Sequence, residues 1–212
     1  MKKGIFMLAA ITAALTLSSC GVKDTAEGEA DEGEEEICFY HYDDGSSEFE
    51  WTGYKTSAKI GVKGSFNEIT ITGDESSDDA ITLLESLSFT MATATVETAD
   101  EARNKKIANS FFGAMEATEM ITGNVKKLSD DGKAVISITM NGVSADIEGT
   151  YTLEDGKFEF TSSVDVSMWN AMDALASISA VCSEQHTGDD GELKTWSEVG
   201  LMFSTQLTSD CD

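Results

Sequence analysis

Polar and apolar residues alternate along most of this chain, and a period of two is typical of β-strands with one buried face. The clearest runs are Ser47–Tyr54 and Ile60–Phe66. A third strand is predicted to open at about Ile81 and to carry the alternation Leu87, Phe89, Met91, Thr93 and Thr95. The pattern therefore predicts a mainly β protein.

Three turn signals set the register of the strands that follow. Asn141-Gly142 is the strongest two-residue hairpin signal in the chain, Asp155-Gly156 is a second, and Ser129–Gly132 has the composition of a four-residue turn. The predicted cross-strand pairs are Val125 with Ile136, Met140 with Val143, Ile138 with Ala145, Ile136 with Ile147, Leu153 with Phe158, Tyr151 with Phe160 and Glu154 with Lys157. The apolar pairs share one face of four strands, and a slip of one residue would turn that face to solvent.

Two segments break the alternation and have helical spacing. Thr98 and Glu101 form a predicted capping box at the start of the first helix. Apolar side chains then recur along one face of this helix: Ile107, Phe111 and Met115, with Phe112 beside them. A second, shorter helix is predicted over Trp169–Val181. The alternation then returns and predicts a last strand over Trp196–Leu207.

The count is eight strands and two short helices, without the strand–helix–strand alternation of a parallel sheet. Eight antiparallel strands with one apolar face can close into a barrel, which removes the exposed edges. We expect an eight-stranded antiparallel barrel with one or two short covering helices. A barrel of this size is either filled by side chains or holds one small elongated ligand.

The N-terminus has the pattern of a secretory leader. Lys2 and Lys3 precede an apolar run, Gly4–Leu17, that is too short to span a bilayer. The run ends in Leu17-Ser18-Ser19-Cys20, which resembles the lipobox of bacterial lipoproteins, where the leader is cleaved before the cysteine and the cysteine is acylated. The alternative is an ordinary cleaved leader followed by a chance cysteine.

These signals divide the chain into three parts. Residues 1–19 are the expected lipoprotein leader, residues 20–36 an acidic disordered tether that begins at lipidated Cys20, and residues 37–212 the folded domain. The expected location is the bacterial cell envelope, with the protein anchored by lipid to the outer membrane and facing the periplasm or the cell surface. Two or more acyl chains would make this membrane anchor stable, whereas one chain binds reversibly.

Charge narrows the choice of partners. The chain has 39 acidic and 14 basic residues and a net charge of −25. Leaving out the two lysines of the leader and the net −7 of residues 21–36 gives −20 for residues 37–212. A domain this acidic repels phosphate backbones, so nucleic acid is not an expected partner. Solubility alone is the ordinary explanation of such a charge.

The sequence carries no signal for catalysis, a metal or a cofactor. His41 and His186 are the only histidines, and neither lies in the strand–turn–helix context of a nucleophile. No Cys-x-x-Cys occurs, Asp189–Glu192 lacks the spacing of a calcium loop, and glycine-rich phosphate loops are absent from the sequence. We therefore expect a protein that is not an enzyme.

Three cysteines remain after Cys20, namely Cys38, Cys182 and Cys211. An exported protein occupies an oxidising compartment, so one disulfide is expected, and three pairings are open. Cys38 precedes the first predicted strand and Cys211 follows the last. Closing a barrel would bring these ends together, which favours Cys38–Cys211.

Several stretches together resemble the YceI-like family of bacterial barrels. They are Trp51–Lys55 with Val62–Phe66, Thr93–Thr98 with Glu101–Asn104 and Ser110–Phe112, Met140–Val143 with Gly149, and His186–Gly188 with Lys194–Val199. The resemblance covers about Cys38 to Asp212. It implies an extended lipocalin-like barrel that binds a polyisoprenoid or a similar long apolar chain, without catalysis.

The chain departs from the family pattern at three places. Arg103-Asn104 replaces the usual Arg-Asp pair, and Ala117–Glu119 stands where a proline is expected. The helix and loop between Trp169 and Asp190 are not the commonest version. These departures bear on the exact ligand more than on the fold.

The inward face of the predicted barrel supplies the candidate ligand-binding residues. They are Phe49, Trp51, Ile60, Val62, Phe66, Phe89, Met91, Phe111, Phe112, Met115, Ile147, Tyr151, Phe158, Phe160 and Phe203. Small residues share the face, among them Gly53, Gly64, Gly149, Thr93 and Ser162, and a mixture of large rings and gaps can leave a tunnel. Phe111, Phe112 and Met115 are expected at one mouth, as a gate or as a plug.

Two functions follow from this face. The first is an envelope lipoprotein that sequesters or carries a polyisoprenoid-like lipid inside the barrel, where each buried CH₂ contributes about 0.8 kcal/mol. The alternative is a surface or periplasmic interaction module with a filled barrel, whose loops, such as Gln185–Glu192, contact a partner protein. A hollow apolar interior favours the first function and a filled interior the second. The oligomeric state is not predicted.

Overall fold

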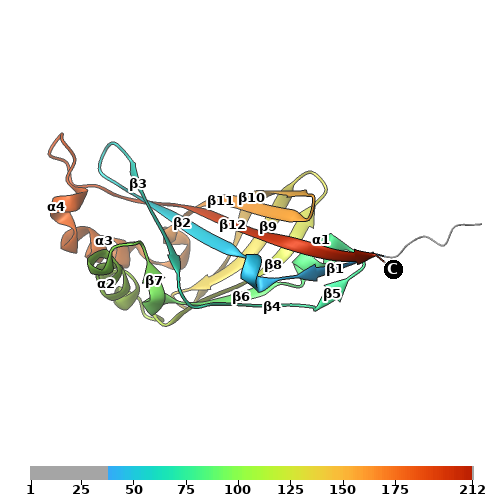
Figure 1. Ribbon diagram of the computed structural model, residues 1–212. Helices are drawn as coiled ribbons and strands as arrows, with labels where there is room; N and C mark the ends of the chain where they lie inside the picture. Colours follow the sequence, from blue (N-terminus) through green and yellow to red (C-terminus); the bar gives the residue numbers. More distant parts are fainter. Residues whose placement is uncertain (1–37, 212) are drawn as a thin grey trace, which may run out of the picture. The chain divides into compact units, whose positions relative to one another are not determined.

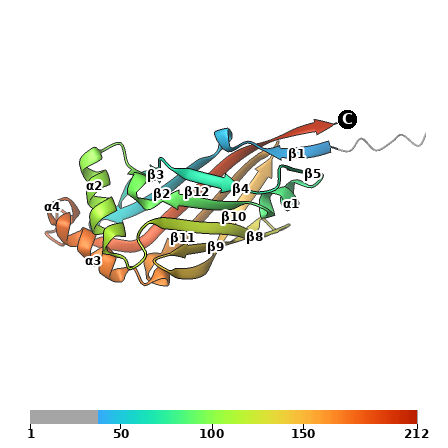
Figure 2. The ribbon, with the colours of Figure 1, turned by 90° about the horizontal axis from the view of Figure 1, so that it is seen from below.

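The computed structural model describes residues 38–211, so the leader, the tether and Cys20 lie outside the described residues. These residues form one antiparallel sheet in the order β4-β6-β8-β9-β10-β11-β12-β2-β3-β7, with β1 paired to β12 and to β5. The strands curl around one interior, with α2, α3 and α4 at one end and α1, β1 and the end of β12 at the other (Figures 1 and 2). The expected mainly β, antiparallel, barrel-like fold is confirmed.

The strands are β1 (Cys38–Tyr42), β2 (Glu48–Lys55), β3 (Ile60–Phe66), β4 (Ile69–Thr72), β5 (Ser76–Ser77), β6 (Ser88–Ala92), β7 (Val96–Glu97), β8 (Met120–Ser129), β9 (Lys133–Met140), β10 (Val143–Glu154), β11 (Lys157–Asp165) and β12 (Thr195–Cys211). The α-helices are α1 (Ala80–Glu85), α2 (Glu101–Ser110), α3 (Met172–Val181) and α4 (Ser183–His186). Single turns of 3-10 helix are η1 (Asp44–Ser46), η2 (Thr93–Thr95), η3 (Phe112–Ala114) and η4 (Val166–Trp169).

The hairpin register predicted from the turns is confirmed. Asn141 and Gly142 both have positive φ, 52° and 72°, as a two-residue turn of type I′ requires. The Cα partners include Ile138 with Ala145, Ile136 with Ile147, Tyr151 with Phe160 and Val125 with Ile136. Between Val125 and Lys127 the register of β8 shifts by one residue at a β-bulge. The predicted pairing therefore holds at Val125 and before it, but not between the bulge and the turn at residues 129–132.

The eight predicted strands correspond to β2, β3, β6 and β8–β12, and the short strands β1, β4, β5 and β7 were not predicted. The predicted opening of a strand at Ile81 is wrong, because α1 occupies this segment. Asp79 caps the helix by accepting a hydrogen bond from the Thr82 amide at 2.6 Å. Leu83 and Leu84 are adjacent and both fully buried, which a half-buried strand does not allow because its neighbouring side chains point to opposite faces.

The predicted capping box of α2 is also wrong. The N-cap is Asp100, whose carboxylate accepts a hydrogen bond from the Arg103 amide at 3.0 Å. The Thr98 hydroxyl instead donates to Asn104 Oδ1 at 2.6 Å. α2 ends at Ser110, so Phe112 belongs to η3 and Met115 follows it.

The strand order is an open path, with β4 at one end and β7 at the other. β3 pairs with β2 from Ile60 to Gly64, and its last residues, Ser65 and Phe66, pair with β7. β4 follows β3 in the chain, but among the described strands it pairs only with β6. Residues 48–50 of β2 pair only with β12. The sheet is therefore a strongly curled half-barrel that is open between β2 and β4.

Two glycines of the inner face lie under aromatic rings. A Cβ added to Gly64 would lie 2.3 Å from the Trp51 ring, and one added to Gly149 would lie 2.3 Å from the Phe160 ring. Both distances are far shorter than a van der Waals contact, so only glycine fits there. The expectation that these glycines leave gaps in the lining is wrong, because the rings fill them.

Candidate ligand-binding site

Two adjoining chambers occupy the interior. The helix-side chamber has a volume of about 400 Å³ and is lined by strands and by residues of α2, α3 and α4. The sheet-side chamber has a volume of about 770 Å³ and is lined by strands and by the loop before α2. Six residues line both chambers: Phe49, Phe66, Phe89, Met91, Ile138 and Leu201. Each volume is typical of a small-molecule site.

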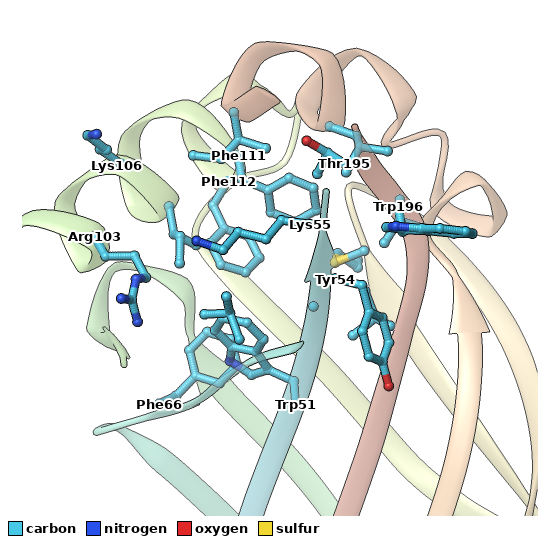
Figure 3. A pocket seen from close by; sticks show the side chains of 18 of the residues that line it. Trp51, Tyr54, Lys55, Phe66, Arg103, Lys106, Phe111, Phe112, Thr195 and Trp196 are labelled. Atoms are coloured by element: carbon cyan, nitrogen blue, oxygen red, sulfur yellow. The ribbon is translucent and has the colours of Figure 1, made fainter. Parts of the chain in front are cut away.

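The helix-side chamber lies beneath α2 and η3 (Figure 3). Phe112 of η3 packs on Phe66 of β3 with ring centroids 5.8 Å apart, and Phe111 meets Phe112 edge to face at 5.1 Å. Trp51 and Lys55 enter from β2. Phe112 is buried, which makes it part of the packed wall, whereas Phe111 is half-buried at the mouth.

The sheet-side chamber begins where Phe49 and Phe66 stack, with ring centroids 6.1 Å apart. Its apolar floor includes Ile147, Phe158 and Phe160, all of which are buried. Its lining also includes residues 48–50, Ile69 and Ile71, which flank the gap between β2 and β4. This chamber therefore reaches the surface through the side of the sheet.

The end of the domain beyond the sheet-side chamber is filled. Leu83 and Leu84 of α1 are fully buried there among other core residues. Tyr151 packs on Phe158 with ring centroids 5.6 Å apart, and its hydroxyl donates to the Ser129 carbonyl at 3.0 Å. The interior is thus solid at the α1 end and hollow towards α2.

Most of the predicted ligand-binding residues line the two chambers. Those that do are Phe49, Trp51, Val62, Phe66, Phe89, Met91, Phe111, Phe112, Ile147, Phe158, Phe160 and Phe203. They come from six strands and from the segment after α2, and the curl of the sheet brings them together. Their contact with a ligand stays a prediction.

Three predicted residues lie outside the lining. Ile60 is 51% exposed because it opens β3 beyond the rim of the barrel, although Val62 on the same face lines the chamber. Met115 is buried in the core behind η3. Tyr151 belongs to the filled end described above.

The prediction missed several lining residues. Ile69 and Ile71 of β4 line the sheet-side chamber, and their alternation with threonines was a readable strand signal. Leu175 and Ile178 of α3 line the helix-side chamber, as do Val199 and Leu201 of β12. The charged residues Lys55, Arg103 and Lys106 were also missed, because nothing in the local pattern relates them to the apolar face.

A small polar network borders the helix-side chamber. His186 Nδ1 lies 2.6 Å from the Thr195 hydroxyl, which donates to Ser179 Oγ at 2.8 Å. Burial lowers the pKa of His186, and the positive charges of Lys55 and Lys106 lower that pKa further. The neutral imidazole is therefore the favoured form in the folded protein.

Other kinds of site find no support among residues 38–211. No group of three or more histidine, cysteine, aspartate or glutamate side chains in this part of the chain is arranged to hold a metal ion. Cys182 is a free, buried thiol beside the helix-side chamber. None of the helices in residues 38–211 has both the length and the apolar character needed to cross a bilayer.

A curled antiparallel sheet around an apolar hollow, capped by short helices, defines the lipocalin-like class of barrels. A family model for the YceI-like domain matches residues 40–199 of this chain. The chain therefore belongs to the YceI-like domain family, which is a family of binding domains.

Comparison with solved structures agrees with this fold. BcnA of Burkholderia cenocepacia matches with a TM-score of 0.52 and 13% identity, over 79% of this chain and 99% of BcnA. A polyisoprenoid binding domain from Saccharophagus degradans, implicated in plant cell wall breakdown, matches with a TM-score of 0.52 and 10% identity, over 81% of this chain and 99% of that domain. No curated protein matches the sequence. At these identities the likeness concerns the fold.

Proposed function

We propose that this protein is an envelope lipoprotein that binds a long apolar lipid, such as a polyisoprenoid, inside the curled sheet and sequesters or carries it. The observation that carries the proposal is the pair of adjoining apolar chambers. An elongated chain that passes from one chamber to the other meets ring and aliphatic surface throughout. Each CH₂ group transferred from water into such a space contributes about 0.8 kcal/mol.

Family membership supports the same ligand class. The chain belongs to a family of binding domains, and a structural neighbour with the same fold is described as a polyisoprenoid binding domain. Nothing in the chambers suggests a reaction, and we propose binding without catalysis. The alternative of an interaction module required a filled interior, whereas about 400 Å³ and 770 Å³ are hollow.

The anchoring is part of the proposal. The Leu17–Cys20 motif and the basic residues before it support cleavage and acylation at Cys20, and the acidic residues 21–36 support a tether. The lipid-binding domain would then remain at an envelope membrane, where long apolar lipids are found. Mass spectrometry of the intact protein from its own host would detect the acyl chains on Cys20.

A single substitution tests lipid binding. Ile138 of β9 lines both chambers, and the next residue, Thr139, lies outside them. Ile138→Trp adds a ring to the hollow, whereas Thr139→Trp places the same ring on the outer face. Native mass spectrometry of protein purified from the host is expected to show a bound apolar lipid on wild type and Thr139→Trp and much less on Ile138→Trp.

Thermal unfolding provides the control, because both variants must remain folded for the comparison to hold. Wild-type protein that is repeatedly empty, and that accepts no long-chain lipid on titration, would overturn the proposal.

A further inference from the structure

Lys55, in the wall of an apolar chamber, has no counter-ion among residues 38–211. Residues 38–211 contain eleven lysines and arginines, and seven of these are in ion pairs. Of the other four, Lys194 lies over the Trp196 ring at 3.7 Å and Lys106 donates to Gln185 at 3.4 Å. Among residues 38–211, which contain 30 acidic residues, only the side chains of Lys55 and Lys127 have no partner.

The two unpaired lysines differ in their surroundings. Lys127 is exposed on the outside of β8, where water solvates its charge. Lys55 is half-buried, and its side chain runs from the end of β2 into the helix-side chamber between Trp51 and Phe112 (Figure 3). An anion bound beside this half-buried ammonium group would supply the counter-ion that it lacks among residues 38–211.

Other donors and cations surround the same chamber. The indole N–H of Trp51 is buried and has no hydrogen-bond partner among the described residues. Arg103 and Lys106 of α2 line the chamber, with one carboxylate, Asp100, which lies 3.6 Å from the Arg103 guanidinium group. The pKa of His186 is lowered in part by Lys55 and Lys106, which is the effect of a positive potential.

The sheet-side chamber has the opposite charge. Its lining contains three glutamates, Glu48, Glu50 and Glu97, and one lysine, Lys63, which is paired with Glu50 at 2.7 Å. An anion would be repelled at this end of the hollow and attracted at the other. The two ends are therefore electrostatically distinct for any ligand that spans them.

We propose that Lys55, with Arg103 beside it, binds the anionic head group of the lipid, a carboxylate or a phosphate monoester. The inference rests on the proposed lipid binding and adds the orientation of the bound lipid. The head group lies at the helix end, and the chain extends past Phe66 towards the sheet-side chamber. An ammonium group and a guanidinium group both form charge-assisted hydrogen bonds to such oxyanions.

Ligands that share a chain and differ in the head group test this inference. Farnesyl phosphate and farnesol are titrated into the delipidated full chain and monitored by tryptophan fluorescence, with palmitate and hexadecanol as the carboxylate pair. We expect wild type to bind at least one anion about tenfold more tightly than its alcohol, and the preference to shrink as salt is raised. A preference within the farnesyl pair would identify the head group as a phosphate monoester, and a preference within the palmitate pair would identify it as a carboxylate.

Three variants assign the preference to Lys55. Lys55→Met keeps the apolar stem and removes the charge, so the preference should fall to within about twofold while alcohol binding is retained. Lys55→Arg should retain it, and Lys127→Met, which removes the other unpaired lysine, should leave it unchanged. Equal affinity of wild type for anion and alcohol, or a preference that survives Lys55→Met, would overturn the inference while leaving lipid binding in place. Absence of binding by every probe would overturn the proposed function and this inference with it.

Discussion

Asn104 stands where the sequence resemblance leads us to expect an aspartate, and its contacts show what the amide does. Its Oδ1 accepts hydrogen bonds from the Thr98 amide at 2.8 Å and from the Thr98 hydroxyl at 2.6 Å. Its Nδ2 donates to Glu97 at 2.9 Å, which lowers the pKa of that carboxyl. An aspartate has no N–H to donate to Glu97. Asn104 therefore stabilises the loop before α2, whose residues Thr98 and Ala99 line the sheet-side chamber.

His186 gives the domain a pH dependence at the residue scale. Because burial, Lys55 and Lys106 lower its pKa in the folded state, the unfolded chain binds a proton at a higher pH than the folded one. Stability is therefore expected to fall as pH drops below about 6.5, the ordinary histidine pKa. The carboxylates with lowered pKa values lose their contribution only near pH 4 and below.

Urea unfolding at pH 7.5 and pH 5.5 measures this effect. Wild type is expected to be less stable at pH 5.5, and His186→Gln, which cannot take up the proton, should lose less stability over the same interval. An equal loss in the two proteins would contradict the assignment to His186.

At the scale of elements, α1 is the plug that closes one end of the hollow. It is only six residues long, so an isolated helix of this sequence would not form in water. The Asp79 cap and the burial of Leu83 and Leu84 hold it in place. Tertiary packing therefore decides the helical state of this segment.

Shortening a buried side chain of α1 should lower the free energy of unfolding of the domain. Leu84→Ala is expected to destabilise the domain by about 2–5 kcal/mol, because it removes buried methyl groups and leaves a cavity. Val181→Ala, which shortens an apolar side chain that is 49% exposed on α3, should change the stability by no more than about 0.5 kcal/mol. Chemical denaturation measures both values, and similar losses in the two variants would contradict the assigned role of α1.

At the scale of the whole molecule, the first and last described strands lie side by side. β1 pairs with the end of β12, and Cys38 and Cys211 are directly opposite Cα partners in this ladder. Directly opposite residues of an antiparallel pair have Cα separations within the range that a disulfide spans. The predicted Cys38–Cys211 bond is therefore compatible with the register, and Cys182 lies apart as a free thiol.

Thiol counting tests this bond. In the full chain with Cys20→Ser, one reactive thiol, that of Cys182, is expected in denaturant without reductant and three after reduction. Cys38→Ser should destabilise the domain by about 5 kcal/mol in the chain-entropy account, because the closed loop is longer than 100 residues. Three thiols before reduction would disprove the bond.

The parts of the fold that were predicted correctly are those set by neighbouring residues. The register of β9, β10 and β11 follows from the Asn141-Gly142 and Asp155-Gly156 turns and from alternation, both of which act within a few residues. The errors lie where distant contacts override local preference. α1 is helical because Leu83 and Leu84 pack into the core at the end of the barrel. Ile60 is exposed because it lies beyond the rim of the barrel.

The sequence by itself determined eight of the twelve described strands, their register in the hairpins and the aromatic inward face, because a period of two and the turn residues are local properties. Only the tertiary structure decided how far the sheet curls, where it stays open between β2 and β4, and which part of the interior is hollow. It also decided that Lys55 faces the hollow without a partner among residues 38–211. These features depend on contacts between residues that are far apart in the chain, and local sequence patterns carry no information about such contacts.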